Sequence, residues 1–397
     1  SLFDCILLNI FIHLNLFLFI SFLNINIETY YLTILSINFI FHFYYFKKYM
    51  KTKIILNKIF SFLIFIFLCI ALFFDISANI RLEWDALSHW IFKARNFYDA
   101  ETIQNLRNLQ FPEYPHLGSF IWGFFWKNSF LEYEYLGRLF NILFYLLSLA
   151  SINQYIFRSN VYLFGISYLF FVILTYDTFM FSGYQEYLIF STLVVISRFI
   201  LIFRTNLKYF LILIFISHLL MWFKDEGLFY FIIFNISILF FSKLILKEKL
   251  FIFVIIFTLP IIQFFLQKYL IGNFSFQADI LHGDLKYLLD LSVLFTKVTS
   301  IIKFIIISII KYKVMIIYFI STIFLFILVK KDLAFIKLFL ICFILNYGLF
   351  FAIYLHTPHD INFLLRVTLD RLVFQTSGFY LIIILLSFRK LFQTFDN

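Results

Sequence analysis

The sequence predicts an all-α, polytopic transmembrane protein, and three observations carry this prediction. Of its 397 residues, 63% are hydrophobic and only 14% are charged, whereas soluble domains are usually about 25% charged. Apolar runs such as 60–74, 210–223 and 229–241 recur along most of the chain, and with their flanks they approach the roughly 20 residues that a bilayer-spanning helix needs. Continuous runs such as 301–310 do not alternate apolar and polar residues, which excludes a transmembrane barrel.

Positive charge is concentrated in short clusters between the apolar runs. The net charge is +10, but the clusters form no basic domain of the kind that binds nucleic acid. The clusters are Lys47, Lys48, Lys51 and Lys53; Lys243, Lys247 and Lys249; Lys330 and Lys331; and Arg389 and Lys390. The positive-inside rule places them in the cytoplasm, which predicts about twelve spans with both chain ends cytoplasmic.

The predicted spans follow from these clusters. They are residues 2–23, 29–46, 54–76, 135–157, 161–178, 187–203, 209–223, 228–242, 250–269, 314–329, 334–354 and 371–388. Two further apolar stretches, 117–126 and 301–310, are short for a crossing and are interpreted as interfacial or re-entrant helices. We therefore expect one transmembrane domain over residues 1–397, with extracytoplasmic segments at 77–116, 271–313 and 355–370.

The predicted topology places most of the polar residues on one side of the membrane, although these residues were not used to derive it. The outer segments are 75–116, 177–186, 224–226, 272–290 and 356–370, and they contain most of the acidic residues and five of the eight histidines. Ionisable groups near a membrane are costly and are usually paired or functional. The pattern therefore predicts a site that opens on the outer face.

The first outer loop has helical periodicity from Asp85 to about Gln110. Its apolar positions are Leu87, Trp90, Ile91, Ala94, Phe97 and Tyr98, and its polar positions are Asp85, His89, Lys93 and Asn96. This predicts a helix lying flat on the membrane, with its polar face lining an aqueous cavity. The structural alternative is that Asp85 caps this helix and pairs with His89.

Two further outer turns carry acidic groups: Glu186 in one, and Lys224, Asp225, Glu226 and Gly227 in the next. The site prediction makes Glu186, Asp225 and Glu226 candidates for acceptor or metal binding. The alternatives are a solvated glutamate in the first turn, and a salt-bridged helix junction with Gly227 as its turn residue in the second.

The last outer loop contains His356, His359, Asp360, Arg366, Asp370 and Arg371. Two histidines three positions apart are a weak pattern for zinc, so no metal ligand is assigned. Arginine binds phosphate bidentately, and two arginines on this side predict a phosphate headgroup at the outer interface. Alternatively, Arg371 pairs with Asp370, or both arginines anchor to anionic lipid.

Several stretches resemble elements of a known superfamily. They are WDALSHW from Trp84, then Lys93 and Ala94, PEYPHLGSFIW from Pro112, KDEGL from Lys224 and LDRL from Leu369. In this order the chain resembles the GT-C glycosyltransferases, particularly bacterial relatives of the protein mannosyltransferase and lipid A aminoarabinose transferase families. The resemblance covers most of the chain and implies a multi-pass protein of the bacterial inner membrane.

The resemblance implies an activity and residue roles. A sugar would move, with inversion, from a polyprenyl-phosphate donor to a glycan, lipid or protein acceptor at the periplasmic face. Asp85 is the residue that matches the general base of the superfamily. Many relatives have two adjacent acidic residues at this place, whereas here Trp84 separates Glu83 from Asp85. Glu83 is therefore the alternative base. Lys93, Arg366 and Arg371 would stabilise the donor phosphate.

The remaining expectations concern the lining of the site and its cofactors. The expected acceptor-binding or cavity-lining residues are His89, Tyr114, His116, Glu186, Asp225, Glu226 and His359. Nothing demands a cofactor, although carboxylates would suit Mg²⁺ or Mn²⁺. The alternative functions are a transporter or flippase, an O-antigen polymerase or ligase, and a non-catalytic scaffold. A transporter predicts charges near the bilayer midplane, whereas these lie at its edges.

Overall fold

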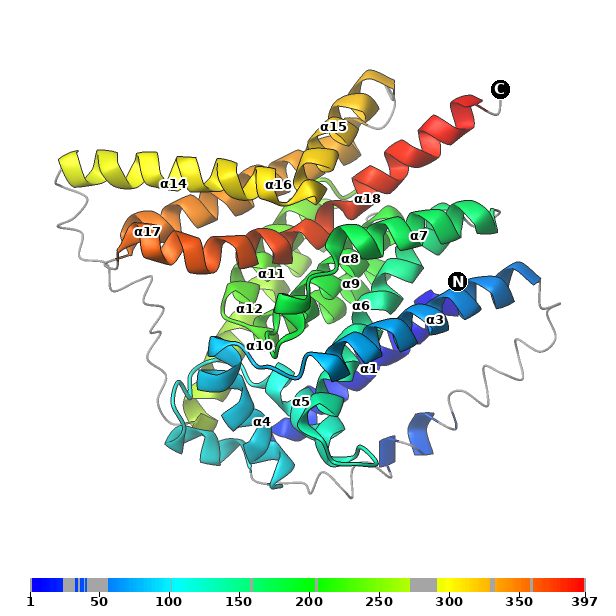
Figure 1. Cartoon of the computed structure of the whole chain (residues 1–397). Helices are drawn as coiled ribbons and strands as arrows, with labels where there is room; N and C mark the ends of the chain where they lie inside the picture. The colour runs from blue at the N-terminus through cyan, green and yellow to red at the C-terminus, as the bar shows by residue number, and fades with distance from the viewer. Residues whose placement is uncertain are drawn as a thin grey trace. The chain divides into compact units, whose positions relative to one another are not determined.

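The computed structural model (Figure 1) is built from helices joined by turns and loops. It describes residues 2–23, 33–34, 36–38, 40, 56–100, 102–157, 160–203, 206–271, 291–328, 333–357 and 360–395. No strand occurs in these ranges, so the all-α prediction is confirmed for them. The chain divides into two compact units, described separately: unit 1 comprises Ser1–Pro112 and His116–Gln185, and unit 2 comprises Glu113–Pro115 and Glu186–Asn397.

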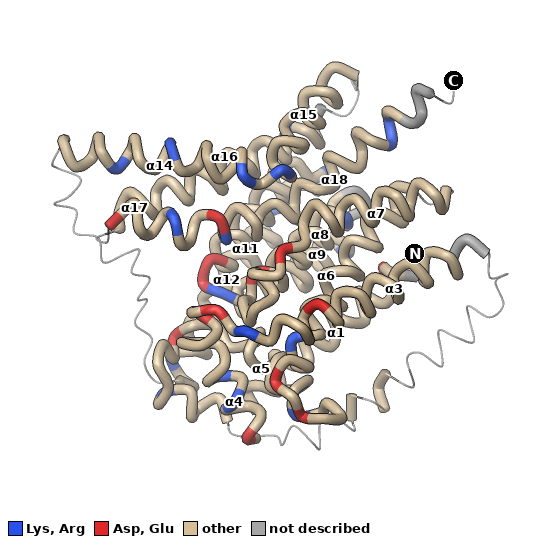
Figure 2. The backbone as a smooth tube through the Cα atoms, viewed as in Figure 1, with Lys and Arg blue, Asp and Glu red and all other residues tan. Residues whose placement is uncertain are grey.

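Within the described ranges, seven helical segments are long and apolar enough to cross a membrane. They lie in α1 (Leu2–Ser21), α3 (Leu56–Ala78), α6 (Glu134–Ile156), α12 (Leu246–Ile271), α14 (Leu291–Lys311), α16 (Leu333–His356) and the run Ile361–Leu391. Shorter apolar helices are α7 (Val161–Thr175), α9 with α10 (Leu207–Ser217 and Leu219–Phe223), α11 (Glu226–Phe240) and α15 (Lys313–Leu328). Figure 2 shows how little charge such helices carry, and α7 has none.

Unit 1 is organised around α6, which packs on α1, α3, α7 and the short α5 (Leu117–Lys127). The residue 117–126 stretch is thus a short helix, as predicted. Gly137 permits the close crossing of α6 and α5, because a Cβ there would lie 2.4 Å from the Trp122 carbonyl oxygen. This packing fixes the start of α6 beneath the first loop.

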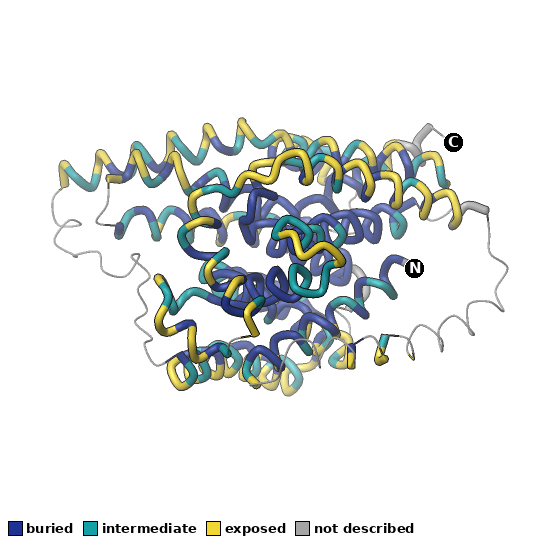
Figure 3. The backbone as a smooth tube through the Cα atoms, turned by 60° about the horizontal axis from the view of Figure 1, so that its bottom comes forward, coloured by how far each residue is buried: buried dark blue, intermediate teal, exposed yellow. Residues whose placement is uncertain are grey.

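Unit 2 has α8 (Glu186–Phe203) packed along α18 (Asp370–Phe395) at its centre. Residues 186–200 of α8 are buried, whereas α12 and α14 expose many large apolar side chains. Figure 3 colours the backbone by this burial. A surface of this kind is expected where helices face lipid. The first turns of α8 and α18 therefore meet inside unit 2.

The 301–310 stretch differs from the prediction. It belongs to the 21-residue α14, so the expectation of a short helix is wrong. The helix extends back past Lys297, which is buried and whose Nζ donates to the carbonyl oxygens of Leu355 and Thr357 at 3.3 and 2.7 Å. A cation at the carboxyl end of α16 interacts favourably with the helix dipole, which lets the helix continue through this lysine.

The first-loop helix is also shorter than predicted. A π-helical turn, η1 (Ala86–Trp90), leads into α4 (Ile91–Tyr98), and a separate 3₁₀ segment, η2 (Ile103–Asn108), follows. The continuous helix to Gln110 is wrong because the chain turns at Ala100, which has a φ of 59°. His89, Lys93 and Asn96 are buried, so the prediction of a solvent-facing polar stripe is also wrong for these three.

Candidate functional site

Asp85 occupies the residue directly before the π-helical turn of unit 1. Its side chain is partly exposed and makes no capping hydrogen bond, which contradicts the capping alternative. The turn closes with the Ile91 N–H donating to the Ala86 carbonyl oxygen, one residue beyond the usual helical spacing. Such π-turns are rare and are found frequently at functional sites, so the local backbone makes this segment a candidate functional site.

Glu83 lies two residues earlier, directly before the helical segment. Its N–H donates to the Ser182 carbonyl oxygen at 3.1 Å, and its Oε1 lies 3.7 Å from Nε of the exposed Arg81. The Glu83 side chain is 23% exposed. Glu83 is therefore tied into the loop by its backbone, while the neighbouring Asp85 opens the helical segment.

His89, in the π-helical turn, and Lys93, in α4, are both buried. The His89 ring packs on Phe111 and Trp84, with ring centroids 4.2 and 5.6 Å apart. Lys93 is 0% exposed, and its Nζ lies 5.9 Å from the Trp90 ring centroid. His89 is thus in contact with aromatic rings, and its cavity-lining role stays a prediction from the sequence.

His116 is a buried histidine at the start of α5. Its Nε2 lies 2.7 Å from Oγ of Ser21, on α1. Burial, reinforced by the positive charge of Lys93, lowers the pKa of His116 to about 3. The ring is therefore neutral at physiological pH, and it joins two helices of unit 1 without carrying charge. Tyr114, two residues earlier and half-buried, is assigned to unit 2.

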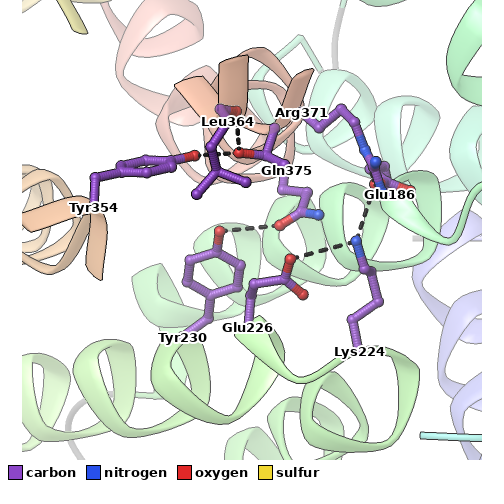
Figure 4. Close-up of polar contacts among 9 residues, drawn as sticks. Glu186, Lys224, Glu226, Tyr230, Tyr354, Leu364, Arg371 and Gln375 are labelled. Carbon is purple, nitrogen blue, oxygen red and sulfur yellow. Dashed lines mark hydrogen bonds and ion pairs between the residues drawn. The ribbon is translucent and has the colours of Figure 1, made fainter. Parts of the chain in front are cut away.

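Unit 2 contains a buried ion cluster centred on Glu186 (Figure 4). Arg371 Nε and Nη2 both lie 2.6 Å from Glu186 Oε1, and Lys224 Nζ lies 3.1 Å from the same oxygen. Glu186 begins α8, Arg371 is in the first turn of α18, and Lys224 is the extended residue that ends α10. Two cations on one buried carboxylate keep it ionised. The prediction of a solvated Glu186 is wrong.

The cluster continues to the helix junction after α10. Lys224 Nζ also lies 3.4 Å from Oε1 of Glu226, whose side chain is 27% exposed. A Cβ on Gly227 would lie 1.8 Å from the Leu220 carbonyl oxygen, so only glycine fits this junction. The salt-bridged junction with Gly227 is therefore confirmed. Asp225 is the N-cap residue of α11, but its side chain makes no capping hydrogen bond.

Gln375 extends the network one turn along α18. The Tyr230 hydroxyl donates to Gln375 Oε1 at 3.0 Å, while Gln375 Nε2 and Glu186 Oε2 have no hydrogen-bond partner among the described residues. Arg371 and Gln375 share a helix face, as do Glu226 and Tyr230 on α11, because four residues separate each pair. Figure 4 shows this arrangement.

One alternative for Arg371 was a local pair with Asp370, but the partner that the structure gives Arg371 is Glu186. Asp370 instead accepts hydrogen bonds from Ser308, at 2.7 Å, and from Lys311 of α14. Arg366 is exposed on η4 (Leu365–Leu369), a second π-helical turn. Arg366 and Arg371 thus differ in environment: one is on the surface and the other is inside an ion cluster.

The last loop also contains Asp360 and His359. Asp360 caps α17 (Ile361–Leu364) by accepting from the N–H groups of Asn362 and Phe363. His359 lies outside the described residues. Among the residues that the structure describes, no group of three or more His, Cys, Asp and Glu could hold a metal ion.

Arg138, Tyr230 and Gln375 were not predicted from the sequence. Tyr230 and Gln375 lie within predicted spans, where tyrosine and glutamine give only a weak signal. Arg138 could have been found, because a lone arginine inside a predicted span is costly and needs a partner.

Comparisons of the chain with protein-family models, with curated proteins and with solved structures find no match.

Proposed function

We propose that this chain is a membrane-embedded glycosyltransferase that uses a polyprenyl-phosphate sugar as donor. The observation that carries the proposal is Asp85. It is a partly exposed carboxylate that directly precedes a π-helical turn in the loop after an apolar helix, α3. Support also comes from the order of the motifs, since WDALSHW, PEYPHLGSFIW, KDEGL and LDRL resemble elements of GT-C enzymes.

In the proposed reaction, Asp85 takes the proton from an acceptor hydroxyl while that oxygen attacks the anomeric carbon. The bond between the anomeric carbon and the phosphate oxygen breaks, and the leaving lipid phosphate keeps the electron pair. The new glycosidic bond forms on the opposite face, so the configuration inverts. Asp85 is favoured over Glu83 because it directly precedes the π-helical turn, whereas the Glu83 carboxylate lies 3.7 Å from Nε of Arg81.

The leaving phosphate gains charge, and a nearby cation lowers the barrier by stabilising it. In unit 1 the proposal gives this role to Lys93, whose ammonium is buried and therefore weakly screened. In unit 2 it favours Arg366 over Arg371, because the Arg371 guanidinium is already neutralised by Glu186. A divalent ion such as Mg²⁺ or Mn²⁺ is not required for this chemistry.

Among the acceptor-binding candidates, Glu186 and Glu226 also serve an ion cluster. For Tyr114, Asp225 and His359 an acceptor-binding role stays a prediction from the sequence. The acceptor is expected to be a glycan, a lipid or a protein of the bacterial envelope.

The proposed topology has about twelve spans, with the first loop on the outer face of the inner membrane. It treats α14 as an interfacial helix, although α14 is long enough to cross. The argument is Lys303, which is exposed in the middle of this helix. A lysine at the bilayer centre costs roughly 2.5–3.5 kcal/mol, whereas one at the interface does not.

Transfer by the purified protein in liposomes tests the proposed function. A panel of radiolabelled polyprenyl-phosphate sugars is offered with envelope acceptors, and the anomeric configuration of the product is determined by NMR. The proposal predicts a product of inverted configuration. Consumption of no donor would contradict it and would favour a transporter or scaffold; a retained configuration would refute the single displacement at Asp85.

A further inference from the structure

Arg138 is a buried arginine whose guanidinium contacts three separate segments of unit 1. It is 1% exposed, in the second turn of α6. Its Nη2 donates to the Ile80 carbonyl oxygen at 3.1 Å, and its Nη1 donates to the Phe181 carbonyl oxygen at 3.3 Å. Its Nε lies 3.0 Å from Glu134 Oε1, one turn earlier on the helix.

The guanidinium binds a carboxylate and two backbone carbonyl oxygens. Glu134 neutralises the charge, which makes the burial of Arg138 tolerable. Nη1 binds the Phe181 carbonyl oxygen, and Nη2 binds the Ile80 carbonyl oxygen while it also donates to Glu134 Oε2 at 3.3 Å. Arginine can do this because its five donors lie in a rigid planar fork, whereas lysine presents one compact ammonium.

The two carbonyls that Arg138 binds lie close in sequence to the two ends of the Glu83–Ser182 hydrogen bond. Ile80 is three residues before Glu83, and Phe181 precedes Ser182, whose carbonyl oxygen accepts the hydrogen bond from the Glu83 N–H at 3.1 Å. The first loop and the turn at residues 178–183 are joined by this contact, and Arg138 binds the backbone of both.

Gly183 provides a second contact between the turn and the first loop, next to Asp85. Its φ of +92° suits glycine, and a Cβ there would lie 2.6 Å from the Cβ of Ala86. The turn thus packs directly against the residue that follows Asp85. The backbone on both sides of Asp85 is held, at Glu83 by a hydrogen bond and at Ala86 by close packing.

We infer that Arg138 is a positioning residue for Asp85: it fixes the backbone of residues 80–86 by binding Ile80 and Phe181, and so sets the direction of the Asp85 carboxylate. The catalytic consequence rests on the proposed function, but the positioning itself does not. Catalysis by a general base requires the carboxylate within hydrogen-bond reach of the acceptor hydroxyl, so a loosened segment slows the reaction.

The test compares Arg138→Lys and Arg138→Gln with wild type by two readouts. Hydrogen exchange of the peptide covering residues 80–86 measures positioning, and sugar transfer measures its consequence. We expect the exchange of this peptide to quicken about tenfold or more in both variants, because local contacts set local opening. We expect kcat to fall at least about tenfold with donor KM nearly constant, since donor binding does not depend on the base.

The matched control is Arg95→Lys. Arg95 is an exposed arginine of α4, in the same loop, whose Nε lies 3.6 Å from Asp99. It should leave both readouts at the wild-type level, because exposed ion pairs contribute little.

The pattern of hydrogen exchange decides whether Arg138 positions residues 80–86. Unchanged exchange at residues 80–86 in both Arg138 variants would overturn the inference. Faster exchange throughout unit 1 would also overturn it, because Arg138 would then stabilise the whole unit. Faster exchange confined to residues 80–86 and the turn at 178–183 supports it; if wild type itself transfers no sugar, the proposed function fails while the positioning stands.

Discussion

At the scale of single residues, the candidate sites combine charge with burial. Glu186 is fully buried with two cations on one carboxylate oxygen, and Arg138 is buried with one carboxylate and two carbonyl oxygens. Removing one partner of a buried ion pair leaves an uncompensated charge, which is costly. These residues should therefore be sensitive to substitution for stability as well as for function.

The Glu186→Gln variant tests the buried cluster. It leaves Lys224 and Arg371 without their shared anion, so we expect unfolding to become easier by about 3–5 kcal/mol. Thermal unfolding of the detergent-solubilised protein measures the change. Glu226→Gln is the control and should cost less than about 1 kcal/mol, because the Glu226 pair is partly solvated. Equal effects of the two variants would refute the central place of Glu186.

His116 predicts a pH dependence of unit 1. Its pKa is about 3 in the folded protein and 6.5 when exposed, so below pH 6.5 the unfolded chain binds a proton that the folded chain does not. Stability is therefore lost as pH falls from about 6.5 toward 3, by about 2 kcal/mol at pH 5. Unfolding at pH 7 and pH 5 measures this loss. His116→Asn should reduce it, and an unchanged pH dependence in that variant would contradict the assignment.

At the scale of elements, helix crossings and helix ends determine the geometry. Gly378 lies where α18 crosses α8, and a Cβ there would lie 2.5 Å from the Phe190 carbonyl oxygen. Because backbone cannot give way as a flexible side chain can, the crossing admits only glycine at this position.

The Gly378→Ala variant tests this crossing. We expect a loss of stability of about 1–3 kcal/mol or more, because the two helices must move apart. Gly348→Ala is the control, since a Cβ at Gly348 meets nothing within 4 Å and alanine favours the helix. Thermal unfolding compares the two. Similar unfolding temperatures for both variants would show that α8 and α18 are not closely packed at this point.

The position of α14 is a prediction at the same scale. An interfacial α14 leaves the first loop and the last loop on the same side of the membrane, whereas a crossing α14 places them on opposite sides. Single cysteines replace the partly exposed Ser88 in the first loop and the exposed Asn362 in the last, in a background without Cys5, Cys69 and Cys342. They are labelled in intact cells with a membrane-impermeant maleimide. We expect both to be labelled. Labelling of only one would assign α14 as a span.

At the scale of the whole molecule, the sequence predicts the helical class well and the detailed site poorly. Apolar composition determines where long helices form, so α1, α3, α6, α12 and α16 lie where the spans were predicted. The end of the first-loop helix depends on a turn at Ala100, and the partners of Glu186 and Arg371 come from segments far apart in sequence. Neither is encoded by local periodicity.

The same limit explains the residues that were missed or misplaced. His89 and Lys93 have the spacing of a polar helix face, but neighbouring aromatic rings cover them. Gln375 begins a short polar stretch with Thr376 and Ser377, and nothing in that stretch indicates that Tyr230 lies beside it. Tertiary contacts decide these environments, and one sequence reports them only indirectly.

The central claim is that Asp85 is the base of a glycosyl transfer. The most direct test is Asp85→Asn in purified, lipid-reconstituted protein, with donor binding and sugar transfer measured on the same sample and Glu83→Gln alongside. The account predicts that Asp85→Asn binds the polyprenyl-phosphate sugar as wild type does but loses transfer by about 100-fold or more, since a positioned base contributes about 10²–10⁴-fold. Wild-type transfer by Asp85→Asn would contradict the account, and a loss confined to Glu83→Gln would move the base to Glu83.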